Sequence, residues 1–102
     1  MLVDDPDAPS GTFVHWTVWG IPPSAREVGA SLPAGAREGT NGSGGKGWTG
    51  PCPPSGTHRY VFSVNALSKH VTLAAGSPPD KVEPAVRAAA IASGSLTARY
   101  GR

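Results

Sequence analysis

Two segments of the chain alternate between apolar and polar residues with a period of two, which predicts two β-strands. The first, residues 13–20, is rich in β-branched and aromatic types. Its alternation predicts two faces, one with Phe13, His15, Thr17 and Trp19 and the other with Val14, Trp16 and Val18. The second face is entirely apolar and is expected to be the core side. In the second strand, residues 58–67, alternation places His58 and Tyr60 side by side on one face.

One helix is predicted over residues 81–93, near the C-terminus. Asp80 and Glu83 have the spacing of a capping box, and Gly94 is expected to end the helix. Its buried face is expected to consist of Val82, Val86 and Ala90. Pro84 leaves a second possibility open, in which the helix begins at Pro84 with Glu83 as its cap.

The rest of the chain predicts little regular structure. Residues 2–3 are expected to end a strand, and residues 71–73 to form a short one. Residues 21–57 contain nine Gly and six Pro without sustained periodicity, so a long loop is expected there. Within it, residues 39–47 are expected to be mobile because glycine-rich chain gains little from packing. Trp48 is expected to anchor the far end of this segment.

The composition fits a single small domain. The chain has 102 residues, 38% of them hydrophobic, with 14 Gly and 11 Pro, which favours a β-rich fold with long turns. The net charge of +2 is spread without a basic stripe, so nucleic-acid binding is not expected. No apolar run is long enough to span a membrane. Cys52 is the only cysteine, which excludes an internal disulfide, and a cytoplasmic location is expected although a lost N-terminal signal stays open.

The candidate chemistry lies in two proline-rich blocks. Residues 4–9 read Asp-Asp-Pro-Asp-Ala-Pro and are followed at once by the strand that carries His15. Residues 47–60 end in His-Arg-Tyr. Because proline fixes φ and restricts the residue before it, both blocks hold their polar groups stiffly. We expect them to form two walls of one pocket, made by Asp5, Asp7, His15, His58 and Tyr60 together with backbone N–H groups around Gly50.

Such a set of side chains suits a small ligand that carries a phosphate. Two imidazoles can donate hydrogen bonds to phosphate oxygens, and a carboxylate can hold an imidazole in one tautomer. A zwitterionic head group such as phosphoethanolamine also offers an ammonium group for the carboxylate. Each residue alone has a plainer explanation, because Asp before Pro is usually a turn former and a single strand His is usually packed. The combination favours a ligand pocket.

The two blocks also resemble a known family. Asp-Pro-Asp-Ala-Pro at residues 5–9, His-Trp at residues 15–16 and Gly-Trp-Thr-Gly-Pro-Cys-Pro-Pro-Ser-Gly-Thr-His-Arg-Tyr at residues 47–60 resemble the phosphatidylethanolamine-binding proteins, also called Raf kinase inhibitor proteins. The likeness is closest to the bacterial branch of this family. It extends along the whole chain, because residues 95–102 resemble the way bacterial members end.

The resemblance implies a fold, a pocket and a function. The implied fold is mainly β, a Greek-key antiparallel sheet with one short C-terminal helix, as one domain over residues 1–102 that lacks the family's N-terminal strands. The implied pocket residues are Asp5, His15, Gly50, Pro51, His58 and Tyr60. The implied function is non-catalytic binding of a small phosphorylated or anionic ligand, without a cofactor, together with regulation of a protein kinase or protease. Bacterial members are often homodimers, so self-association is expected as well.

Three alternatives stay open. A hydrolase could use His15 or His58 as acid or base, with Asp5 orienting the imidazole. A zinc site would draw on the same Asp and His side chains, but the sequence lacks the close ligand spacing that such sites have. Nucleophile candidates are weak, because Ser55 lacks the strand-to-helix elbow and Cys52 reads as a loop thiol. Lastly, a chain without its N-terminal strands could be a fragment that does not function alone.

Overall fold

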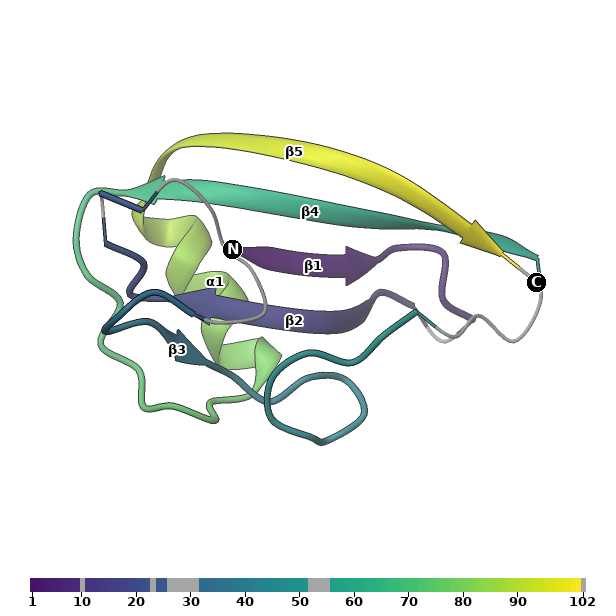
Figure 1. The fold of residues 1–102 in the computed structure, drawn as a ribbon, viewed down its shortest axis with the longest axis horizontal. Helices are drawn as coiled ribbons and strands as arrows, with labels where there is room; N and C mark the ends of the chain where they lie inside the picture. Colours follow the sequence, from purple (N-terminus) through teal and green to yellow (C-terminus); the bar gives the residue numbers. More distant parts are fainter. Residues whose placement is uncertain (10, 23, 26–31, 52–55, 102) are drawn as a thin grey trace.

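The strands of the chain form one antiparallel sheet in a Greek-key order (Figure 1). The structure, a computed structural model, describes residues 1–9, 11–22, 24–25, 32–51 and 56–101. Its elements are β1 (Leu2–Asp5), β2 (Phe13–Trp19), β3 (Arg37–Glu38), β4 (Thr57–Leu67), α1 (Pro79–Ala89) and β5 (Ala90–Gly101). The order across the sheet is β3-β2-β1-β4-β5, in which β4 returns to lie beside β1. The predicted mainly-β Greek-key fold is therefore confirmed.

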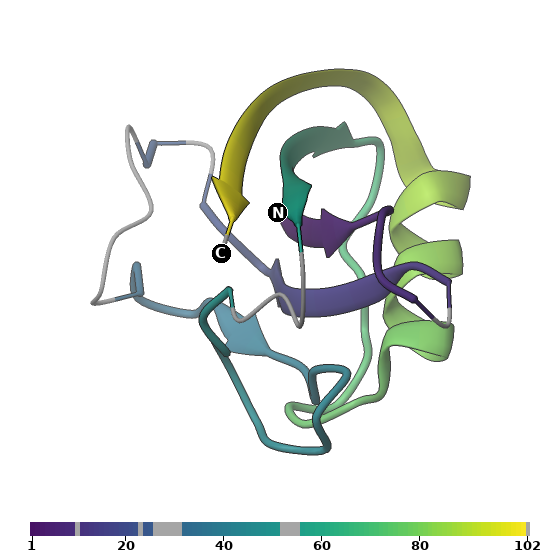
Figure 2. The same ribbon diagram turned by 90° about the vertical axis from the view of Figure 1, so that its right-hand side faces the viewer.

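The two faces of the sheet are covered by different parts of the chain (Figure 2). Helix α1 packs on one face, where Leu2 and Trp19 meet Val82 and Val86 in the buried core. On the opposite face Trp48 lies against Trp16 and Phe62. Gly39 and Gly42 instead hydrogen-bond to β2 along its free edge, beyond β3. Both sides of β2 are therefore buried, and the prediction that only one face of this strand turns toward the core is wrong.

A bulge in β2 at His15 explains why simple alternation fails there. Val3 pairs with Trp16 and the next residue, Asp4, pairs with Val14, so His15 has no partner of its own in β1. An extra residue in one strand reverses the parity of the side chains beyond it. His15 and Trp16 consequently share the face that Trp48 covers, although they are sequence neighbours. The predicted set of Phe13, His15, Thr17 and Trp19 is divided between the two faces, and so is the opposite set.

Helix α1 begins earlier and ends earlier than predicted. It starts at Pro79. The first turn of a helix tolerates proline, because an N–H at that position would have no partner within the helix. The residue before it makes no side-chain capping bond, so the predicted capping box does not form; Glu83 instead binds Arg87 one turn later. Pro84 lies inside the helix, and both predicted starts, at residue 81 and at Pro84, are wrong. Val82 and Val86 of the predicted buried face are buried, but Ala90 is wrong, because it is the first residue of β5 and is only partly buried.

Two strands and one turn lie where the sequence predicted none. β5 begins at residue 90, so the chain passes from helix to strand without the expected stop at Gly94, and the helix is not C-terminal. β3 lies within the predicted loop, whereas residues 71–73 form no strand and pack by Val71 and Leu73 against the core. Residues 39–47 close into a turn through backbone hydrogen bonds and the Thr40–Lys46 bridge. The prediction that the whole of residues 21–57 lacks regular structure is therefore wrong.

Candidate functional site

A buried carboxylate and an imidazole form the centre of the candidate site. Asp5 ends β1 and His58 lies at the start of β4, the strand that pairs with β1, so two neighbouring strands bring the residues together. Asp5 Oδ2 lies 2.7 Å from His58 Nδ1, and the two residues are only 4% and 7% exposed. The other carboxylate oxygen, Oδ1, accepts a hydrogen bond from the Asp7 N–H at 2.8 Å, within the proline-locked turn. Both oxygens of Asp5 are thus engaged within the protein.

The second imidazole is held by the backbone of the opposite block. His15, 5% exposed, lies with its Nδ1 2.8 Å from the carbonyl oxygen of Thr49, and the Thr49 N–H donates to the His15 carbonyl at 3.1 Å. A carbonyl oxygen can only accept, so Nδ1 of His15 carries a proton. Nδ1 of His58 likewise donates to the Asp5 carboxylate. In both rings Nε2 is therefore the nitrogen through which a ligand can be bound.

Tyr60 lies between the two histidines. Its ring centroid is 5.2 Å from that of His15, in an edge-on arrangement, and 6.5 Å from that of His58, nearly parallel to it. The ring of Phe13 approaches His15 at 4.8 Å. This confirms that His58 and Tyr60 share a face of β4, and it places His15 beside them.

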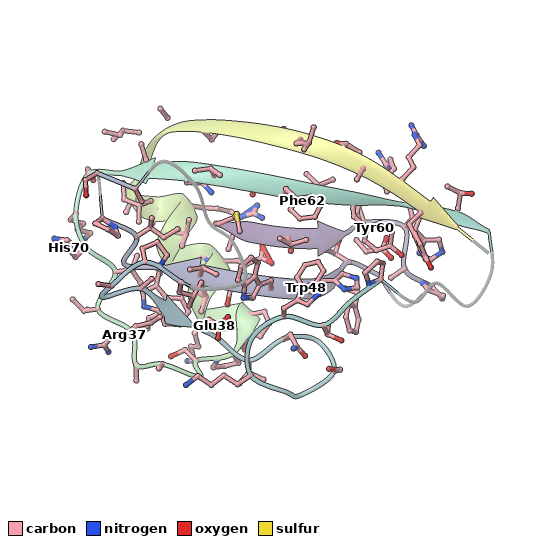
Figure 3. All side chains as sticks on the ribbon, in the orientation of Figure 1. Arg37, Glu38, Trp48, Tyr60, Phe62 and His70 are labelled. Atoms are coloured by element: carbon pink, nitrogen blue, oxygen red, sulfur yellow. The ribbon has the colours of Figure 1, made fainter. Side chains whose placement is uncertain are left out.

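An aromatic shelf of Trp48, Phe62 and Trp16 borders His15. Trp48 is half-exposed, stacks on Phe62 at 6.4 Å and meets Trp16 edge-on at 5.8 Å. Its ring centroid is 6.3 Å from that of His15. Figure 3 shows Tyr60, Phe62 and Trp48 near one another over the middle of the sheet, with His70 at the far end of the molecule. The expected anchoring of this segment by Trp48 is seen in these contacts.

The remaining predicted pocket residues lie at different distances from this centre. The carboxylate of Asp7 binds Arg59 through the arginine backbone N–H, Nε and Nη2, at 2.9, 3.0 and 2.8 Å. It is thus brought to Arg59 rather than to the histidines, and that contact lowers the pKa of Asp7 well below its usual range. Gly50 and Pro51 follow Thr49 and Trp48, so they flank the site next to His15. The nucleophile candidates Cys52 and Ser55 lie outside the described residues.

Sequence reasoning did not identify the contacts that position His15. The Thr49 carbonyl oxygen holds its ring. Every residue type has a backbone carbonyl, so the sequence does not indicate which one accepts this hydrogen bond. Phe62 could have been found, since alternation places it on the His58 face. Phe13 could have been found in the same way, since alternation places it on the face of His15, and the two rings are in contact.

A second polar cluster lies on the helix side of the sheet. Asp4 faces α1, where its Oδ2 is 3.9 Å from Nη2 of Arg87, and Arg87 also binds Glu83 at 2.7 Å. Burial, with Glu83 as a further cause, raises the pKa of Asp4 from 3.8 to about 7. A cleft of about 770 Å³ opens here, lined among others by Asp4, Val14 and Glu83. It lies on the face opposite the histidines, so it is separate from the candidate site.

The described residues contain neither a metal-binding cluster nor a helix that could span a membrane. Among them, no group of three or more His, Cys, Asp or Glu side chains is placed to hold a metal ion. The helix in the described part of the chain is too short and too polar to cross a membrane.

Comparison with known proteins identifies the family. The sequence model of the family described as phosphatidylethanolamine-binding protein matches residues 1–101. A UPF0098 protein of Methanothermobacter thermautotrophicus is 37% identical over 100% of this chain and 72% of its own length. A UPF0098 protein of Aquifex aeolicus is 39% identical, over 100% of this chain and 64% of its own length. The chain belongs to the phosphatidylethanolamine-binding protein family.

Solved structures agree with this assignment. Escherichia coli YbcL, described as a new member of the mammalian PEBP family, superposes with a TM-score of 0.89 at 35% identity over 99% of this chain and 69% of its own. A putative homologue from Chlamydia trachomatis, CT736, gives 0.86 at 30% identity with the same coverage. The chain thus spans roughly two-thirds of these proteins, and 51% of the putative lipoprotein LppC of Mycobacterium tuberculosis, to which it is 37% identical.

Proposed function

We propose that the chain binds a small phosphorylated or anionic ligand between His15 and His58, without transforming it. The observation that carries the proposal is the pair of buried imidazoles on either side of Tyr60, each with Nδ1 committed to an acceptor of the protein. Two Nε2 atoms are then the groups that can meet the ligand. Trp48 and Phe62 would border an apolar part of that ligand.

The tautomers determine the charge that the site needs. With Nδ1 already donating, Nε2 can donate to a phosphate oxygen only when the ring is protonated. Binding of a phosphate dianion should therefore be linked to proton uptake, and affinity should fall as pH rises across the range of about 5 to 8 in which imidazoles usually titrate. The fall approaches tenfold per pH unit for each proton taken up. Asp5 supports the imidazolium of His58 by its negative charge.

The sequence predicted that Asp5 would bind the ammonium group of a zwitterionic ligand, and this geometry favours a different role for it. The carboxylate is 4% exposed and both its oxygens already accept hydrogen bonds, so we propose that it positions His58 rather than contacting an ammonium group. Phosphoethanolamine and inorganic phosphate should then respond alike to loss of Asp5. Family membership supports a phosphoethanolamine-like head group as the ligand class.

Calorimetric titration with inorganic phosphate and with O-phosphoethanolamine tests this proposal. His15→Ala and His58→Ala should each weaken binding at least tenfold and reduce its pH dependence. His70→Ala is the matched control, because His70 is exposed and lies at the far end of the molecule (Figure 3). Binding that is independent of pH, or equal losses in all three variants, would contradict the proposal.

The Asp5–His58 contact also favours a second candidate, a hydrolase in which His58 acts as the general base. A carboxylate that orients an imidazole through Nδ1 is the arrangement by which many enzymes activate water or a nucleophile. Turnover of a panel of phosphate monoesters and carboxylate esters, abolished in His58→Ala and retained in His70→Ala, would favour this candidate over simple binding.

The family resemblance extends the proposal to partners and location. Regulation of a protein kinase or protease is proposed from the family alone. Affinity capture of kinases and proteases, with the protein in its phosphate-bound and phosphate-free forms as bait, would test it. A cytoplasmic location is likewise a proposal. The name of LppC, a putative lipoprotein, makes the cell envelope the alternative. Fractionation of the producing cells would decide between them.

A further inference from the structure

The turn over residues 39–47 contains a chemically labile pair, Asn41 followed by Gly42. The backbone nitrogen of the residue after an Asn can attack the side-chain carbonyl carbon of that Asn, and glycine hinders this attack least because it has no Cβ. Asn is for such reasons one of the thermolabile residue types. The sequence contains one other Asn, Asn65, and no Gln. Asn65 is followed by Ala66, whose Cβ hinders the same attack.

The fold holds both reacting groups of the pair. Asn41 is 4% exposed, and its Nδ2 donates to the Gly47 carbonyl at 2.8 Å. Its Oδ1 accepts hydrogen bonds from the N–H and the hydroxyl of Ser43, at 3.0 and 2.6 Å. The attacking nitrogen is occupied as well, because the Gly42 N–H donates to the Val14 carbonyl at 2.7 Å. The attack therefore requires the turn to open and to detach from β2.

The fold also requires both residues of the pair. A Cβ at Gly42 would lie 2.8 Å from Cε2 of Phe13, the ring that contacts His15, so a larger residue does not fit. An Asp in place of Asn41 would bring a carboxylate oxygen to the Gly47 carbonyl, where neither oxygen can donate. It would also bury a charge without a partner. The turn thus depends on Asn followed by Gly, and burial protects the pair.

We propose that Asn41 is a covalent modification site, and that its deamidation opens the turn of residues 39–47 and loosens the aromatic shelf. In the opened turn, base removes the Gly42 N–H proton and the nitrogen forms a bond to Cγ of Asn41. The bond from Cγ to Nδ2 breaks, and Nδ2 takes up a proton and leaves as ammonia. Water then opens the succinimide ring to aspartate or isoaspartate. The overall reaction consumes water, releases ammonia and needs no oxidant or reductant.

The product disturbs the segment that carries Trp48. The Gly47 carbonyl loses its donor, and Gly47 is joined directly to Trp48. Thr49, whose carbonyl holds the His15 ring, follows at once. An effect on phosphate affinity rests on the proposed function, whereas the reaction and the opening of the turn do not. Because the reaction is irreversible and needs base, the shelf is lost slowly as the protein ages, and faster at higher pH.

Peptide mapping by mass spectrometry, during incubation at mildly alkaline pH, measures the conversion of both Asn residues. In guanidinium chloride, Asn41 should convert well before Asn65. In the folded protein, Asn41 should convert roughly tenfold or more slowly than in the unfolded chain, because a reaction of the open state is limited by the population of that state. Equal rates at Asn41 in the folded and the unfolded chain would overturn the protection by the turn.

Near-ultraviolet circular dichroism of the tryptophans, recorded on the same folded samples, tests the consequence. The change in this spectrum should follow the conversion of Asn41 with the same time course, and Asn41→Asp should show it from the start. Asn65→Asp, at a half-buried residue of β4, is the matched control and should keep the wild-type spectrum. The time course in the wild type decides even if Asn41→Asp does not fold. A wild-type spectrum after conversion of Asn41 would overturn the proposal, and neither readout uses phosphate, so a failure of the proposed function leaves this test intact.

Discussion

At the scale of single residues, the site depends on which nitrogen of each histidine is already occupied. Asp5 and the Thr49 carbonyl each take an Nδ1 hydrogen, at 2.7 and 2.8 Å. These contacts fix the orientation of the two rings and leave Nε2 of each as the nitrogen that can bind a ligand. The identity of the acceptor differs, because one is a carboxylate and the other a neutral carbonyl. Only the Asp5 carboxylate can offset a positive charge on the ring beside it.

The first prediction concerns this difference. Asp5→Asn keeps the shape of the side chain but removes the charge that offsets a protonated His58, so phosphate affinity near neutral pH should fall about tenfold. Asp7→Asn is the control, since Asp7 binds the exposed Arg59 and should change affinity little. Calorimetric titration of both variants measures the effect. Equal affinities of Asp5→Asn and the wild type would show that the carboxylate has no part in binding.

The second prediction concerns Asp4 on the helix side. Its pKa is raised to about 7 in the folded protein, so between about pH 4 and 7 the folded state holds a proton that the unfolded state has lost. Stability contributed by this group therefore decreases as pH rises through that window. Asp4→Asn should melt close to the wild type near pH 4 and several degrees above it beyond pH 7.

Thermal unfolding followed by circular dichroism measures this difference. The wild type also contains the Met1 amino group, whose pKa burial lowers to about 6 and which acts in the opposite sense, so the informative quantity is the difference between variants. Asp80→Asn, at an exposed residue of the same cleft, is the control. A difference in melting temperature between Asp4→Asn and the wild type that is the same at every pH would exclude titration of Asp4 as its cause.

At the scale of elements, the sequence was informative where a strand is long and amphipathic. Alternation predicted β4 and the shared face of His58 and Tyr60, and the apolar spacing predicted the buried face of α1. It could not predict the bulge at His15, because a bulge is a property of the pairing between β1 and β2. β3 and β5 were missed for a related reason. Their strand conformation depends on pairing with β2 and β4, and not on their own sequence pattern. β5 has exposed side chains throughout and so lacks a hydrophobic signal.

The third prediction concerns the turn that supports Trp48. Gly47 has a φ of +89°, and a Cβ there would meet the Glu38 carboxylate at 3.1 Å, the group that accepts the Trp16 indole N–H at 2.8 Å. Gly44 has the same φ of +89° but open space around it. Gly44→Ala should cost about 1 kcal/mol from the left-handed backbone alone. Gly47→Ala should cost about 1 kcal/mol more, because the Glu38–Trp16 hydrogen bond is disturbed.

Denaturant unfolding of the two variants measures these costs, and the near-ultraviolet circular dichroism of the tryptophans reports on the aromatic shelf. Only Gly47→Ala should change that spectrum. Equal costs and identical spectra would show that the space against Glu38 is not limiting.

At the scale of the whole molecule, β1 separates two polar clusters on opposite faces of the sheet. Two consecutive residues, Asp4 and Asp5, each contribute to one of them. Asp4 turns toward α1 and Arg87, while Asp5 turns toward His58. One sheet thus carries a half-buried acid on the helix side and the candidate ligand site on the other. All the residues named in that site lie within residues 5–62.

The central claim is that phosphate is bound by Nε2 of His15 and His58. Long-range nitrogen–proton NMR correlations of the three histidine side chains, recorded during titration with inorganic phosphate near pH 6, observe these atoms directly. The Nε2 resonances of His15 and His58 should shift with added phosphate and both rings should keep their Nδ1 proton, while His70 should not respond beyond the effect of ionic strength. Equal shifts of all three histidines, or no shift at His15 and His58 at saturating phosphate, would contradict it.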